Sequence, residues 1–467
     1  MGRLATGIVL VSALAGTRQA RAAGGQLRYE VVADAGGSDL QIELNVPAGL
    51  RAALVVDPEA TAFVDGVRRE EFGRWVAVAR TPAGWRAPEC RRSGCQIRYL
   101  FHLRAAAHAI DDPDTAAGRG DALVGPVSTW LLRPAELPEG GLRAQVHVTV
   151  PPPFALVTGL PRVPHEADTF LVALLPYFVS PYAAFGRFDH AEIHVGGATI
   201  DLAVESGSLP RDLPRLRTWV GGAAAAVSTY YGRFPVDRAL VLAVPQAAGF
   251  HGKAMGGGGA AVLLQMVPGA DLADPGIDWQ ATHEMIHLAV PELPRDQIWL
   301  SEGLATYVEP LARSMTGELS PASVWGDLVR GLPKGQPGPG DRGLDRTHSW
   351  GRTYWGGALF AFVADLEIRK ATDNRQSLMT ALRGALVAGA DARVQWPVEK
   401  FLTACDHATG TTVLIDLYRR MATHPVTVDL QAIWRELGVS LSADRVDLDP
   451  RAPLAAIRRS MIGRQNR

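Results

Sequence analysis

The sequence predicts a multidomain α+β protein with an N-terminal all-β domain, a central mixed domain and a C-terminal helical region. The first observation is length, because 467 residues exceed one ordinary hydrophobic core and suggest roughly two to four compact units. The second is a series of short alternating or β-branched runs over residues 26–206, separated by proline and glycine clusters. The third is helical periodicity across nearly all of residues 350–467.

The overall composition excludes several classes of protein. Hydrophobic residues make up 47% of the chain and charged residues 20%, and the net charge is -1. These values are typical of a globular protein and not of a disordered, collagen-like or strongly basic chain. Binding of nucleic acid calls for concentrated positive charge, so we do not expect nucleic acid as a partner.

Residues 1–22 differ from the rest of the chain and match a signal peptide. Arg3 precedes an apolar run over residues 4–15, and Ala20-Arg21-Ala22 provides an A-x-A cleavage site. The alternatives are an uncleaved membrane anchor or an ordinary buried helix, because only one positive charge precedes the run. No later stretch reaches about 18 uninterrupted apolar residues. We therefore expect a periplasmic or secreted product with no stable membrane insertion after cleavage.

The β-rich segment carries the clearest strand patterns. Alternation predicts strands over residues 28–32, 40–46, 96–103 and 142–150. Cys90 and Cys95 are five positions apart, a spacing that a hairpin loop can close into a disulfide in an oxidising compartment. Whether they pair stays open at this point. Cys405 lies among apolar residues, which indicates a buried helical thiol.

The central segment changes from pure β patterns to mixed ones. Residues 212–231 have alanine-rich helical spacing and are followed by glycine and proline. Residues 238–244 and 257–267 then have the composition of buried strands, the second entered through a glycine run. His190 and His194 lie four residues apart in a predicted strand, where that spacing only places them on one side, so we interpret both as structural.

A metal-binding pattern lies in the next two predicted helices, residues 278–290 and 296–315, the first with Asp278 as its N-cap. The first helix contains H-E-x-x-H, in which His283 and His287 are four residues apart. At about 3.6 residues per turn, the two imidazoles share one helical face and can reach the same metal ion. A pattern this short also occurs by chance in long proteins, so the surrounding residues must show whether it binds a metal ion.

The context adds a base and a third ligand. Glu284 directly follows the first histidine and is offset around the helix, so its carboxylate can reach a metal-bound water without being a ligand. Zinc acidifies such a water until a carboxylate can take its proton. Glu302 lies fifteen residues beyond His287, near the start of the second helix. The sequence therefore predicts one zinc ion held by His283, His287 and Glu302, with Glu284 as general base.

The run from Trp299 to Glu309, W-L-S-E-G-L-A-T-Y-V-E, resembles the W-L-x-E-G-x-A-x-Y-x-E segment of the aminopeptidase N and glycyl aminopeptidase families. These are gluzincin metallopeptidases, and the resemblance implies that Glu302 binds zinc. The specific motifs are confined to about residues 249–357. In layout the resemblance implies a β-rich domain at residues 23–206 and a thermolysin-like zinc catalytic domain at residues 207–345. A helical region at residues 346–467 would complete the active-site cleft.

Two more residues acquire roles through the resemblance. The segment containing Tyr354 is similar to the family's Tyr-x-Lys-Gly segment, whose tyrosine donates a hydrogen bond to the tetrahedral intermediate. We therefore expect Tyr354 to stabilise the oxyanion, with a merely packed tyrosine as the alternative and His348 as the reserve candidate. Glu309 follows Glu302 by two helical turns and either orients a zinc-binding histidine or is a solvated surface residue.

Two departures from the families are informative. Their aminopeptidases carry a Gly-x-Met-Glu-Asn segment whose glutamate binds the free amino terminus of the substrate. Here the corresponding stretch contains Met255, Gly256 and Gly257, with glycine in place of that glutamate. We expect these three residues to contact an extended peptide by strand addition, while aminopeptidase or endopeptidase character stays open. Ser301 stands where the families often have asparagine, which weakens any supporting role carried across to it.

The sequence therefore predicts an exported zinc peptidase that acts on peptide or protein substrates. A non-catalytic zinc-containing peptide-binding protein is one alternative, motivated by the missing amine-binding glutamate. A zinc hydrolase of a non-peptide bond is the other. The sequence does not determine the preferred side chain at the cleavage point or the oligomeric state.

Overall fold

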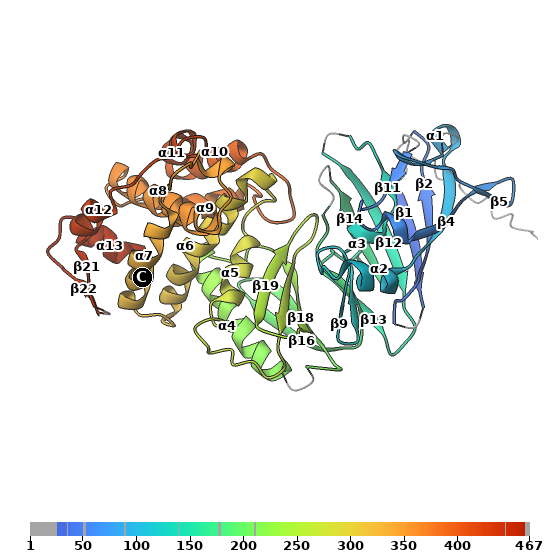
Figure 1. The fold of residues 1–467 in the computed structure, drawn as a ribbon, viewed down its shortest axis with the longest axis horizontal. Helices are drawn as coiled ribbons and strands as arrows, with labels where there is room; N and C mark the ends of the chain where they lie inside the picture. The colour runs from blue at the N-terminus through green and yellow to red at the C-terminus, as the bar shows by residue number, and fades with distance from the viewer. Residues whose placement is uncertain are drawn as a thin grey trace, which may run out of the picture.

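The computed structural model describes residues 26–34, 36–49, 53–87, 90–138, 140–175, 179–209, 212–443 and 445–462. The predicted signal peptide lies outside these residues, so it stays a prediction. Figure 1 shows a β-rich region at one end of the molecule, a mixed sheet with helices in the middle and a helical region at the other end. Within the described ranges no helix is long and apolar enough to cross a membrane.

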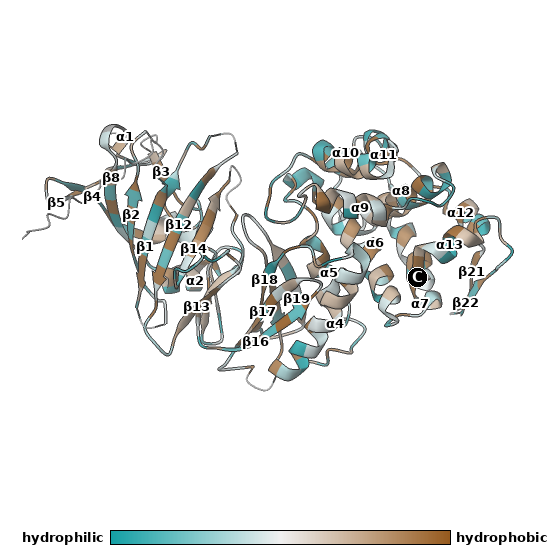
Figure 2. Cartoon of the chain, turned by 180° about the vertical axis from the view of Figure 1, so that it is seen from behind, coloured by the Kyte–Doolittle hydropathy of each residue, from teal (hydrophilic) through white to brown (hydrophobic). Residues whose placement is uncertain are grey.

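The N-terminal region is built around a seven-stranded sheet in the order β14-β12-β1-β2-β8-β4-β5. Its paired strands are antiparallel except β1 and β12, which are parallel. Buried and exposed side chains alternate along β1 and β2, and Figure 2 shows the matching alternation of hydropathy, because one face packs on the core. The strands are β1 (Leu27–Ala33), β2 (Leu40–Val46), β4 (Val64–Glu71), β5 (Arg74–Ala77), β8 (Cys95–Phe101), β12 (Leu142–Thr149) and β14 (Thr169–Leu174).

The prediction of an all-β N-terminal domain is wrong in one respect, because this region also contains helices. Helix α2 (Leu103–Ile110) buries Leu103, Ala106 and Ala107, a helical spacing that the strand-based interpretation missed. The predicted strand over residues 96–103 accordingly ends at Phe101. The remaining short helices of the region are α1 (Cys90–Ser93), η1 (Thr61–Phe63) and α3 (Val127–Trp130).

The structure gives the state of each cysteine, including the pair that the sequence left open. Cys90 and Cys95 form a disulfide, which closes the short helix α1 against the start of β8. Cys405 is a free thiol, and it is buried in helix α10 (Val398–Thr409).

Two smaller sheets complete the β-rich region. One has the order β13-β15-β10-β9, and the other has the order β11-β3-β7-β6. The first packs against the middle of the molecule, where Val124, Val157 and Tyr182 share a core with residues of β18 and β20. The strands are β3 (Ala53–Val55), β6 (Arg80–Thr81), β7 (Gly84–Arg86), β9 (Ala117–Arg119), β10 (Ala122–Val124), β11 (Arg133–Pro134), β13 (Ala155–Thr158) and β15 (Ala183–Gly186).

The central sheet has the order β16-β17-β18-β20-β19. Both faces are covered: Leu240 and Leu242 of β18 pack on the β-rich region, while Val241 and Ala243 pack on the helices. Such two-sided burial explains why β18 is apolar almost throughout. The strands are β16 (Phe188–Val195), β17 (Ala198–Glu205), β18 (Arg238–Pro245), β19 (Phe250–Met255) and β20 (Ala261–Met266).

The predicted strands of this segment are confirmed as β18 and β20, and the helix predicted at residues 212–231 is α4 (Leu213–Tyr231). Gly232 ends α4 at φ 79°, a left-handed conformation that favours glycine. Strand β19 was not predicted. It is one of the two edge strands of the sheet, antiparallel to β20 and opposite β16.

The C-terminal region is helical, as predicted, apart from one hairpin of β21 (Val439–Ser442) and β22 (Arg445–Leu448). Its helices share one hydrophobic core with α4 and the central sheet. The helices from α5 onward are α5 (Gln280–His287), η2 (Arg295–Gln297), α6 (Ile298–Thr316), α7 (Pro321–Gly331), η3 (Leu332–Gly335), η4 (Leu344–Arg346), the π-helix η5 (Gly351–Gly356), α8 (Gly357–Ala371), α9 (Leu378–Val387), α10, α11 (Val413–Met421), α12 (Leu430–Leu437) and α13 (Ala455–Ile462).

Candidate metal centre

Helix α5 lies between α4, α6 and the edge strand β19, and it carries both histidines of the H-E-x-x-H pattern. Its N-cap is Trp279, so the prediction of Asp278 as N-cap is wrong. The side chain of Asp278 turns away and accepts a hydrogen bond from Arg313 of α6, 2.5 Å from Nη2 to Oδ2. A charged partner on the neighbouring helix outweighs the local capping preference.

The structure brings His283, His287 and Glu302 together. Glu302 Oε2 lies 3.3 Å from His283 Nε2 and 3.5 Å from His287 Nε2. The three ligand atoms all lie within 4.8 Å of one another. Two nitrogen or oxygen ligands about 2.0–2.2 Å from a tetrahedral zinc ion are separated by about 3.3–3.5 Å, so this donor set and its spacing fit zinc.

Ser301 fixes the orientation of one imidazole. Its Oγ lies 2.8 Å from His287 Nδ1. When Nδ1–H donates to this hydroxyl, the lone pair of Nε2 faces the other two donors. Ser301 therefore contacts a candidate metal-binding imidazole, although its departure from the families' asparagine had weakened the expectation of a supporting role.

Electrostatics couple the three donors. Burial lowers the pKa of His287, but the carboxylate of Glu302 outweighs this effect and raises that pKa to about 9. Burial alone would raise the pKa of Glu302, yet the charge of His287 and the hydrogen bonds from both histidines hold it well below its usual range. Without metal the cluster thus binds a proton, and a metal ion has to displace it.

Glu284 lies between the metal cluster and the edge strand. It is buried, with 8% of its surface exposed. A Cβ atom at Gly252 of β19 would lie 2.7 Å from its Cγ, so the strand can approach this carboxylate only because residue 252 is glycine. The amide of Gly252 donates to Gln280 Oε1 at 3.2 Å, which ties the strand to the start of α5.

Tyr354 reaches the cluster from η5. Its ring lies 6.4 Å from that of His283 between centroids, in a stacked arrangement. Burial, aided by the charges of Glu302 and Glu284, raises the pKa of Tyr354 to about 12, so its hydroxyl remains a donor at neutral pH. Helix α6, which carries Glu302, meets the start of α8, which directly follows η5, backbone against backbone, because a Cβ on Gly303 would lie 2.1 Å from the carbonyl carbon of Gly357.

The reserve candidate His348 is exposed, and no contact between it and the cluster occurs among the described residues. Glu309 is buried, so the interpretation as a solvated surface residue is wrong. Its Oε1 accepts a hydrogen bond from Arg313 Nη1 at 2.9 Å, and it does not bond either histidine within the described ranges. Glu309 belongs to an ion-pair network and not to the metal centre.

The predicted substrate-binding residues lie at the end of the edge strand β19 and directly after it. Met255 is the last residue of β19. The amide of Gly256 donates to Glu292 Oε1 at 3.1 Å, and that of Gly257 donates to Ala392 O at 2.9 Å. Their amides already have acceptors within the protein, and their contact with a substrate stays a prediction.

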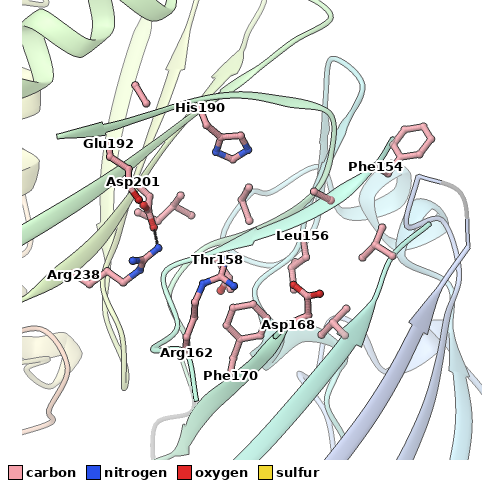
Figure 3. Close-up of a pocket in the computed structure, with 16 residues that line it drawn as sticks. Phe154, Leu156, Thr158, Arg162, Asp168, Phe170, His190, Glu192, Asp201 and Arg238 are labelled. Atoms are coloured by element: carbon pink, nitrogen blue, oxygen red, sulfur yellow. Dashed lines mark hydrogen bonds and ion pairs between the residues drawn. The ribbon is translucent and has the colours of Figure 1, made fainter. Parts of the chain in front are cut away.

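A separate cavity of about 470 Å³ is lined by residues of the seven-stranded sheet, of β13 and of β16, β17 and β18 in the central sheet. Figure 3 shows Arg238 paired with Asp201 in it, Arg162 beside Phe170 and His190 facing the space. Its lining includes none of the three metal-binding candidates. Arg238 and Asp201 form an ion pair within its described lining, and the cluster of two histidines and a glutamate lies on α5 and α6.

Comparison with known proteins gives the fold its context. No protein-family model matches the sequence, and no curated protein sequence matches it. Among solved structures, an aminopeptidase N family protein from Idiomarina loihiensis is similar at a TM-score of 0.65 and 13% identity, over 89% of this chain and 78% of that one. An M1 zinc metallopeptidase from Deinococcus radiodurans is similar at a TM-score of 0.52 and 16% identity, over 86% of this chain and 95% of that one. The chain therefore has a gluzincin aminopeptidase-like fold, with the β-rich and helical regions of that multidomain architecture.

Proposed function

We propose that this chain is a zinc-dependent peptidase of the gluzincin type, which hydrolyses peptide bonds with a metal-activated water. The observation that carries the proposal is the spacing of 3.3 Å and 3.5 Å from Glu302 Oε2 to the two histidine Nε2 atoms, with Glu284 buried beside them. The similar structures support it, since one is an aminopeptidase N family protein and the other is an M1 zinc metallopeptidase.

The bound zinc ion would lower the pKa of a water molecule and polarise the substrate carbonyl. His283, His287 and Glu302 would hold it, and Ser301 would keep His287 in the correct tautomer. Glu284 would take the proton from the water and pass it to the leaving amine. The hydroxyl of Tyr354 would donate a hydrogen bond to the oxyanion, which its raised pKa permits at neutral pH.

The proposal includes the organisation predicted from the sequence. Residues 207–345 would form the thermolysin-like catalytic domain, and residues 346–467 would complete the active-site cleft. Residues 1–22 would direct export to the periplasm or the medium. The edge position of β19 supports substrate binding by strand addition, because an extended peptide can pair only with an unpaired strand edge.

The test is cleavage of a peptide library by the wild-type protein and by Glu284→Gln, each with its zinc content measured. We expect chelator-sensitive cleavage by the wild type and a loss of at least about a thousandfold in the variant, with zinc retained. Unchanged turnover in the variant would reject Glu284 as the base. Tight peptide binding without turnover in the wild type would favour the zinc-containing binding protein, and turnover only of non-peptide substrates would favour the other hydrolase class.

A further inference from the structure

The helix that carries Tyr354 has an unusual form. Residues Gly351–Gly356 make up the π-helix η5, and the ordinary α-helix α8 continues directly from it. A π-helical turn is rare and is found frequently at functional sites. The contacts that hold η5 therefore bear on the position of the Tyr354 ring.

The end of α7 and η3, residues 331–335, form a cradle for η5. A Cβ atom on Gly331 would lie 1.9 Å from the ring of Trp355, and one on Gly335 would lie 2.2 Å from the carbonyl oxygen of Trp355. Both close approaches depend on glycine. The cradle therefore holds the residue that directly follows Tyr354.

Arg352 makes the charged contact between η5 and the loop before it. The residue is buried, with 3% of its surface exposed. Its Nε lies 2.7 Å from Asp341 Oδ2, and its Nη1 donates a hydrogen bond to the carbonyl oxygen of Gly335. Asp341 is held in turn, because its Oδ1 accepts a hydrogen bond from the amide of Gly343 at 2.8 Å. Arg352 thus links η5 to the cradle and to the loop that follows the cradle.

Stability alone does not account for this buried pair. Arg352 Nε and Asp341 Oδ2 lie within ion-pair distance but are not aligned as a hydrogen bond, and Arg352 Nη2 has no hydrogen-bond partner among the described residues. Burial lowers the pKa of Arg352, although the charge of Asp341 opposes this effect. Replacing a buried ion pair by apolar side chains of similar volume is often neutral or stabilising. A pair that satisfies its own donors so poorly calls for a different role.

The ring of Tyr354 needs support from its main chain. Within the described part of the chain, its hydroxyl makes no hydrogen bond that could orient it. Its ring lies 6.4 Å from that of His283 and 5.9 Å from that of Trp350, between centroids. Trp350 is 62% exposed, so it gives the ring little support. The main chain of η5 therefore determines where the hydroxyl lies, and Arg352 anchors that main chain two residues away.

We propose that Arg352, through its buried pair with Asp341, is a positioning residue that holds η5 so that the Tyr354 hydroxyl faces the metal centre. The inference rests on the proposed function, in which Tyr354 donates a hydrogen bond to the oxyanion. Such a donor has to lie within hydrogen-bond distance of the oxyanion, and a displacement of about 1 Å can cost about 10²-fold in rate. Arg352 itself does not touch the reacting atoms.

The kinetic test is a double-mutant cycle. Arg352→Met should lower kcat by about 10- to 100-fold and change KM by less than about threefold, because a misplaced donor is missed mainly in the transition state. In the Tyr354→Phe background the same substitution should lower kcat by less than about threefold, since the hydroxyl that it positions is absent. Arg352→Lys should lose less than Arg352→Met, because it keeps a cation beside Asp341.

Arg458→Met is the matched control. Arg458 is also a buried arginine, with 4% exposed, but it donates to the carbonyl oxygens of Leu437 and Gly438 at the end of α12. Its loss should leave kcat unchanged in the folded protein. Circular dichroism with thermal unfolding checks the fold of each variant. Asp341→Asn, which keeps an acceptor for the Gly343 amide, takes the place of Arg352→Met if that variant does not fold.

A second measurement does not depend on turnover. 3-Fluorotyrosine is incorporated at position 354 alone, and its ¹⁹F resonance is recorded in the metal-free wild type, Arg352→Met and Arg458→Met. We expect the resonance to move toward its position in the unfolded chain in Arg352→Met and to stay in place in Arg458→Met.

Equal losses of kcat with and without the Tyr354 hydroxyl would overturn the inference, because Arg352 would then act on the whole site. An unchanged kcat and an unmoved resonance in folded Arg352→Met would overturn it as well. Failure of the proposed function is distinguishable. A protein that cleaves no peptide, but whose ¹⁹F resonance moves in Arg352→Met and not in Arg458→Met, would contradict only the peptidase.

Discussion

Helix α6 carries two groups of buried polar side chains, one near each end. Near its end, Arg313 pairs with Asp278 at 2.5 Å, Glu309 at 2.9 Å and Glu318 at 2.8 Å. Near its start, Glu302 lies against His283 and His287, and no arginine or lysine pairs with it in the described part of the chain. Both groups link α6 to α5 or to the residues just before it.

The difference between the groups indicates their roles. The Arg313 group is complete, because the chain itself provides the cation that compensates its carboxylates. The Glu302 group presents two nitrogens and a carboxylate oxygen to one point, with no arginine or lysine paired with Glu302 among the described residues, and a metal ion would complete it. We therefore expect the first group to contribute to stability and the second to function, and the two should respond differently to substitution.

The largest effect should follow from Arg313→Met. Removing the guanidinium group leaves Glu309 buried without a charged partner, which should lower the free energy of unfolding by about 3–5 kcal/mol. Urea unfolding measures this change. Glu318→Gln is the control, since Glu318 is 42% exposed and its loss should cost less than about 1 kcal/mol. Loss of zinc at unchanged stability would place Arg313 in the metal centre instead.

Tyr354→Phe tests the group of residues at the metal centre and should have the next largest effect. Removing the hydroxyl should lower kcat by about 10²–10³-fold with little change in KM, because the lost hydrogen bond forms mainly in the transition state. Steady-state kinetics on one peptide measure both constants. His348→Ala is the control. A loss of kcat in His348→Ala, together with full activity of Tyr354→Phe, would assign oxyanion stabilisation to His348 instead of Tyr354.

Ser301→Ala should have the smallest of these effects. Loss of the hydrogen bond to His287 Nδ1 should weaken zinc binding by about 10–100-fold and leave the fold intact. Competition with a chromophoric chelator measures the affinity. Ser314→Ala is the control, because it also removes a serine hydroxyl from α6, farther along the helix, and it should leave the zinc affinity unchanged. Equal affinities in Ser301→Ala and the wild type would mean that the hydroxyl does not orient the imidazole.

The sequence predicted the metal-binding candidates because their spacing is local. His283 and His287 are one helical turn apart, which periodicity predicts. Glu302 was assigned from its position near the start of the next helix and from the resemblance of its segment to the aminopeptidase N family. The same holds for β2, whose alternation matched its observed bounds of Leu40–Val46. Apolar strands with turn residues at both ends, such as β18, were predictable for the same reason.

The missed features depend on contacts between distant segments. Strand β19 has little strand character, and its glycine at position 252 is explained only by Glu284, which lies 32 positions away. Glu292 meets Gly256 across 36 positions. Asp278 was misassigned because Arg313, 35 positions later, was not part of the local pattern. Pairings of this kind have no periodicity in the sequence that could reveal them.

The zinc content of the wild type, His283→Ala and Arg313→Met can be measured by elemental analysis after reconstitution and removal of free metal. We expect one zinc ion per chain in the wild type and in Arg313→Met, and none in folded His283→Ala. A wild type that binds no zinc, or a His283→Ala variant that retains it, would contradict the central claim that α5 and α6 form a zinc centre.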